Sequence, residues 1–83
     1  MAGIDQQIAN LRRQIAEAAA RQKSYDRAKQ AARANRDDRA VRDADAGMKA
    51  ERKRMDGFAQ QISSLERQKR EVRSQQRIAQ RSR

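Results

Sequence analysis

Large apolar side chains recur along this chain at alternating intervals of four and three residues. One run, near the start, continues at the same spacing to Tyr25 and Ala32, and a second begins near Met48. This seven-residue repeat is typical of helices that pack along a shared seam as a coiled coil. We therefore expect two amphipathic helices. The residues expected to hold their seam are Ile4, Ile8, Leu11, Ile15, Ala18, Tyr25, Met55, Phe58, Ile62, Leu65 and Val72.

Residues that oppose helix formation are scarce. The 83 residues contain no proline and only three glycines, so nothing interrupts a helix strongly. Strand-forming side chains are also few, and apolar and polar residues do not alternate between turn signals. The sequence therefore predicts an all-α fold, with residues 1–83 in a single unit.

The heptad pattern lapses between Asn35 and Gly47, where four aspartates and a glycine are suited to capping or turning the chain. We expect an antiparallel two-helix coiled-coil hairpin. Helix 1 covers about 4–36, the turn lies within 35–47, and helix 2 covers about 44–80. The alternative is one long helix in a parallel coiled-coil oligomer, since each glycine would cost a helix only about 1 kcal/mol.

Two antiparallel pairings of the seams are considered. In the preferred pairing, opposed residues have numbers that add to 80, so that Ile15 lies level with Leu65. In the other, the numbers add to 87, which opposes polar Lys29 to Phe58. Polar residues at seam positions commonly set register or oligomeric state at some cost in stability. The polar seam positions are Gln22, Lys29, Arg36, Arg39, Glu51, Lys69 and Gln76.

The apolar content is too small for a conventional core. Sixteen of the hydrophobic residues are alanine, which leaves fourteen large apolar side chains. At roughly 2 kcal/mol for each buried side chain, these cannot offset the roughly 1.5 kcal/mol per ordered residue that opposes folding. We therefore expect a protein partner or a homo-oligomer.

The chain carries 21 basic and 11 acidic residues, a net charge of +10. The excess is concentrated in residues 21–40 and in 61–83, which include a basic C-terminal tail at 67–83. Guanidinium groups form paired hydrogen bonds with phosphate or carboxylate, and so large an excess favours an anionic partner. The residues expected to contact that partner are Arg67, Lys69, Arg70, Arg73, Arg77, Arg81 and Arg83.

Catalytic chemistry has little support in the sequence. Histidine and cysteine are absent, and no glycine-rich phosphate loop is present. The aspartates between residues 37 and 45 suit helix capping better than metal binding. We expect no enzyme activity, no catalytic, cofactor-binding or metal-binding residues, and no small-molecule substrate.

These features favour a non-catalytic structural or adaptor protein, a basic hairpin that assembles with itself or another protein and docks on an acidic partner. Such a protein could be a small component of a larger assembly. The alternative is a sequence-independent nucleic-acid-binding protein whose Arg and Lys side chains contact phosphates. The narrow, alanine-rich apolar faces argue against membrane binding. With no signal peptide or membrane span evident, we expect a cytoplasmic protein or part of a particle assembled in the cytoplasm.

Overall fold

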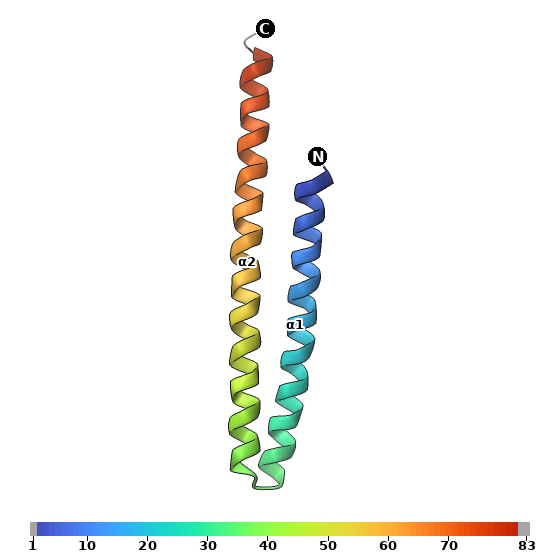
Figure 1. Cartoon of the computed structure of the whole chain (residues 1–83), viewed down its shortest axis with the longest axis vertical. Coiled ribbons are helices and arrows are strands. Elements are labelled where there is room, and N and C mark those ends of the chain that lie inside the picture. The colour runs from blue at the N-terminus through green and yellow to red at the C-terminus, as the bar shows by residue number, and fades with distance from the viewer. Residues whose placement is uncertain (1, 82–83) are drawn as a thin grey trace.

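In a computed structural model, the chain forms two long α-helices that lie side by side and run in opposite directions (Figure 1). Helix α1 covers Ala2–Ala34 and helix α2 covers Asp38–Arg81. The structure describes the backbone of residues 2–81 and the side chains of residues 3–78. The predicted all-α helical hairpin is confirmed, and the alternative of one long continuous helix is wrong.

The turn between the helices satisfies the backbone groups of both helix ends. The amide of Asp37 donates to the carbonyl of Ala32 at 2.9 Å, and the amide of Arg36 donates to the carbonyl of Arg33 at 3.1 Å. Arg36 takes a left-handed conformation with a φ of 56°, as expected for this type of helix end. The Oδ1 atom of Asp37 then accepts a hydrogen bond from the amide of Ala40 at 3.1 Å and so caps α2. Two adjacent residues therefore close one helix and start the next.

The turn lies at the very start of the window that the sequence indicates. Helix α2 begins at Asp38, about six residues before the expected start near 44. Asp43 and Asp45 lie inside this helix instead of capping it. Gly47 also lies inside α2 and has no positive φ. The earlier start follows from Asp37, because its capping hydrogen bond stabilises the first turn of α2 at that point.

The early turn also sets the register of the two helices. In three of the four ion pairs that join the helices among the described residues, the residue numbers add to 72–74, namely Arg21 with Glu51, Lys29 with Asp45 and Asp5 with Lys69. The longest of the four, Arg12 with Glu66 at 3.5 Å, adds to 78. The preferred pairing, with numbers adding to 80, is therefore wrong by about one heptad, and the other pairing is wrong by about two. The physical reason is that a seven-residue repeat matches itself after every shift of seven, so the turn decides between the matches.

The core of the hairpin is thin. The buried apolar residues among the described side chains are Ile8, Ala18, Ala32 and Ala44, and no large side chain is fully buried. The larger seam residues are half-buried, namely Ile4, Leu11, Ile15, Met55, Phe58, Ile62 and Leu65. Two helices shield a seam from only two directions, so solvent reaches it along both flanks. The resulting molecule is a rod of 72 × 16 × 12 Å.

Helix α2 extends well past the start of α1 (Figure 1). It has 44 residues against 33 in α1, a difference of about three helical turns. Ile78 in this part of α2 is 63% exposed. Val72 is 46% exposed and lines a pocket with Ile4 at the start of α1, instead of lying level with Ile8 as the pairing that adds to 80 implies.

Candidate docking surfaces

Four of the arginines expected to meet an anionic partner share one face of α2. Arg67, Arg70, Arg73 and Arg77 follow one another at intervals of three, three and four residues and are all exposed. Residues three or four apart lie on the same side of a helix. Within the described residues, none of the four forms an ion pair across the hairpin or along the helix. We call these four residues the arginine stripe.

Lys69 lies among these arginines but has a different role. Its Nζ atom donates to Oδ1 of Asp5 at 2.6 Å and joins α2 to the first turns of α1. This hydrogen bond and the charge of Lys69 lower the pKa of Asp5, and the nearby charge of Arg73 lowers it further. Lys69 therefore helps to hold the hairpin together. The side chain of Arg81 and all of Arg83 lie outside the described residues.

One flank of the seam is closed by ion pairs between the helices. Near the start of α1, Arg12 lies 3.5 Å from Glu66 and Asp5 binds Lys69. Nearer the turn, the ammonium of Lys29 lies 2.7 Å from Oδ1 of Asp45 and lowers the pKa of that carboxyl group by hydrogen bonding. All of these contacts are at least partly exposed, so each stabilises the hairpin only slightly. Together they fix which residues face each other on this flank.

A buried carboxylate interrupts the apolar seam midway along the hairpin. Glu51 is only 3% exposed, and its Oε1 atom accepts hydrogen bonds from Nε of Arg21 at 3.0 Å and Nη1 of Arg54 at 3.3 Å. The bond to Glu51 raises the pKa of Arg21. The Oε2 atom of Glu51 is buried without a hydrogen-bond partner. The sequence marks residue 51 as a polar seam position, but it does not reveal these partners, which depend on the register.

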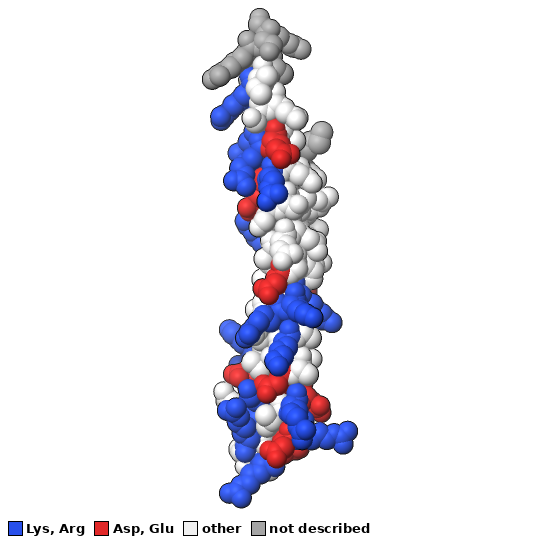
Figure 2. All heavy atoms as spheres, turned by 90° about the vertical axis from the view of Figure 1, so that its left-hand side faces the viewer, with Lys and Arg blue, Asp and Glu red and all other residues white. Residues whose placement is uncertain are grey.

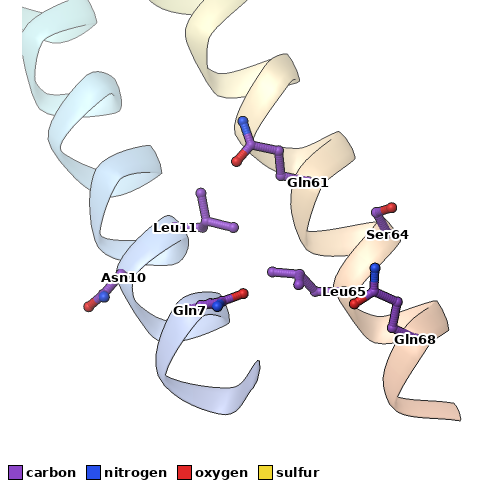
Figure 3. A pocket seen from close by; sticks show the side chains of 7 residues that line it. All are labelled: Gln7, Asn10, Leu11, Gln61, Ser64, Leu65 and Gln68. Carbon is purple, nitrogen blue, oxygen red and sulfur yellow. The ribbon is translucent and has the colours of Figure 1, made fainter. Parts of the chain in front are cut away.

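The other flank of the seam is open in the half of the hairpin farther from the turn, which we call the distal half. It carries a groove of about 430 Å³ there. Leu11 of α1 and Leu65 of α2 point toward each other at its floor (Figure 3). The remaining lining side chains are uncharged and polar, namely Gln7, Asn10, Gln61, Ser64 and Gln68. We call this surface the amide groove.

The amide groove belongs to a charge-free part of a highly charged molecule. Neither residues 6–11 nor residues 57–65 contain a charged side chain, although 39% of the whole chain is charged. The register brings these two segments side by side. In Figure 2 the distal half accordingly shows a white area beside the arginines, whereas the turn end mixes blue and red side chains. These two runs are visible in the sequence, but only the register shows that they form one surface.

The predicted seam residues otherwise differ in exposure. Tyr25 is 37% exposed and lies against Gly47, not level with Met55 as the preferred pairing implies. Among the described residues, no three potential metal ligands gather into a cluster, and no helix is long and apolar enough to cross a bilayer. The fold and these surfaces define an antiparallel two-helix coiled-coil hairpin. No protein family, curated protein or solved structure matches the chain.

Proposed function

We propose that this chain is a non-catalytic structural or adaptor protein that assembles with itself or another protein and docks on an acidic protein through the arginine stripe. The observation that carries the proposal is the arrangement of Arg67, Arg70, Arg73 and Arg77 on one exposed face of α2 without ion-pair partners among the described residues. The proposed setting is the cytoplasm, or a larger particle assembled there.

The turn end is less suited to this role, although it also carries many cations. Arg36, Arg39 and Arg42 lie among Asp37, Asp38 and Asp43, so opposite charges lie close together there (Figure 2). In the arginine stripe the only acidic residue within the span from 67 to 77 is Glu71. The field of the stripe is therefore more uniformly positive and better suited to attract an anionic surface.

Nucleic acid is the alternative partner, because guanidinium groups bind phosphate as readily as carboxylate. Proteins that bind single strands usually add aromatic side chains on which bases stack. The two aromatic residues here do not serve the stripe, since Phe58 lies half-buried in the seam and Tyr25 lies against Gly47 near the turn. This arrangement favours an acidic protein surface over single-stranded nucleic acid.

The test replaces the four stripe arginines with glutamine and measures binding to polyglutamate and to an unstructured RNA across a salt series. We expect weaker binding and a flatter salt dependence, because fewer counterions are displaced. The matched control changes Arg27, Arg39, Arg42 and Arg52 to glutamine, which removes the same charge from exposed positions nearer the turn. Stronger binding to polyglutamate supports the adaptor and stronger binding to RNA supports the alternative. If both variants flatten the salt dependence of binding equally, the arginine stripe is not the docking surface.

A further inference from the structure

We propose that a second copy of this chain covers the amide groove, so that two hairpins form a two-fold symmetric four-helix bundle. This deepens the assembly part of the proposed function and rests on it. The floor of the groove explains why a cover is needed, because Leu11 and Leu65 are only partly buried there. A third and fourth helix would bury both side chains and complete the core that two helices leave thin.

The exposed area of the single chain leaves ample surface for such a contact. The hairpin exposes 7044 Å², whereas a folded monomer of 9.6 kDa typically exposes about 5,100 Å². The excess is about 1,900 Å². A stable dimer buries roughly 800 Å² on each partner, so one face of the rod is sufficient to supply the interface.

The chemistry of the two flanks shows which one a second hairpin can cover. On the closed flank, Arg12 with Glu66 and Asp5 with Lys69 would lose solvation on burial, which is costly for charged groups. The amide groove has no charged side chain to desolvate. The groove therefore offers an apolar floor with a polar, uncharged rim, which is the usual anatomy of a protein interface.

A second copy fits the groove better than a charged partner does. The amides of Gln7, Gln61 and Gln68 each carry both hydrogen-bond donors and acceptors, so the surface can pair with its own copy across a two-fold axis. Two chains that each carry ten net positive charges repel one another over most of their surfaces. The charge-free band is the face on which that repulsion is weakest.

The experiment is sedimentation equilibrium on the whole chain at physiological salt, with two double variants of equal charge. In the first, Gln7→Lys and Gln61→Lys place cations in the amide groove. In the second, Gln30→Lys and Gln60→Lys place them at exposed positions of each helix outside that groove. Lysine and glutamine have similar helix propensities, and circular dichroism would confirm that both variants remain helical.

We expect the unmodified chain to sediment at twice its mass of 9.6 kDa, and the control variant to remain a dimer. The groove variant should dissociate, with a dimer dissociation constant raised at least tenfold. A monomeric unmodified chain, a larger oligomer, or two variants that dissociate alike or not at all would each overturn the proposal. Because these glutamines lie off the arginine stripe, an unmodified chain that is monomeric but still binds polyglutamate through the stripe would overturn this inference alone.

Discussion

The aromatic ring of Tyr25 occupies the space that a side chain at Gly47 would fill. A Cβ atom at residue 47 would come within 2.5–2.7 Å of three ring atoms, which is closer than carbon atoms can approach. Glycine inside a helix costs about 1 kcal/mol relative to alanine. Here it allows a large side chain from α1 to lie directly against the backbone of α2.

Replacing this glycine should therefore have opposite effects in two backgrounds. Gly47→Ala in the natural sequence should lower the free energy of unfolding, because displacing the ring costs about 1–3 kcal/mol and outweighs the gain in helix propensity. In a Tyr25→Ala background, the same change should raise it by about 1 kcal/mol. Urea unfolding of the four chains at one protein concentration measures both effects. If Gly47→Ala changes the free energy of unfolding in the same direction in both backgrounds, the Tyr25 ring does not pack against residue 47 as described.

Arg36 offers a way to stabilise the turn. A residue with a side chain is disfavoured in the left-handed conformation by roughly 1–2 kcal/mol, and Arg36 adopts it with a φ of 56°. Arg36→Gly should therefore raise the free energy of unfolding by about 1 kcal/mol. Arg33→Gly removes the same charge three residues earlier, within α1, and should lower it by about 1 kcal/mol. If the melting temperature shifts in the same direction in both variants, the left-handed conformation of residue 36 is not the cause of the change in stability.

The free energy of unfolding should change differently when the buried charge of Glu51 is removed and when its partner Arg21 is removed. Arg21→Gln leaves the carboxylate buried with one charged donor fewer, which should cost about 1–3 kcal/mol. Glu51→Met removes the buried charge and extends the apolar seam, so stability should remain equal or increase. Denaturant unfolding compares the two variants. A larger loss for Glu51→Met than for Arg21→Gln would mean that the ion pair itself stabilises the hairpin.

Stability should decrease in acid because two exposed carboxylates have depressed pKa values. Lys69 lowers the pKa of Asp5 and Lys29 lowers that of Asp45, both from an ordinary value of 3.8. A pKa that is lower in the folded chain gives stability that is present above the unfolded value and is lost as the pH falls through the folded one. The melting temperature should therefore fall as the pH drops through about 4 and below.

The double variant Asp5→Asn and Asp45→Asn should flatten this dependence and should do so most clearly at low salt. The control is Asp43→Asn with Asp56→Asn, two exposed aspartates that form no ion pair within the described residues. Melting curves recorded between pH 6 and pH 2 give the comparison. An equal change of slope in both double variants would assign the acid sensitivity to overall charge.

The sequence is sufficient to predict the helices and their apolar faces, because both follow from local spacing. Ile8 and Ala18 are buried as the heptad pattern implies, and Leu11 and Leu65 are half-buried on facing helices. The register is not predictable from the same signal, since the repeat matches itself at every shift of seven residues. The structure takes the shift that brings Arg21 to Glu51, which neither of the two predicted pairings allows.

The turn decides the register, and its sequence signal is weak. A left-handed residue at a helix end is most often glycine, whereas this turn uses Arg36 and places Gly47 inside a helix. Asp37 has the residue type of a helix cap, but three further aspartates follow within eight residues. The candidate surfaces depend on this choice, because only the correct register assembles the amide groove or reveals that Lys69 is engaged by Asp5.

The amide groove and the arginine stripe lie on different sides of α2. Two copies joined along their grooves would turn their stripes outward and form a bivalent rod. When one stripe holds a partner that displays several acidic sites, binding of the second stripe to that partner becomes intramolecular. Linkage of this kind can strengthen binding by about 10²–10⁴-fold without any new contact. Weak single contacts would then suffice for firm attachment to a repetitive acidic surface, while an isolated acidic protein would be released quickly.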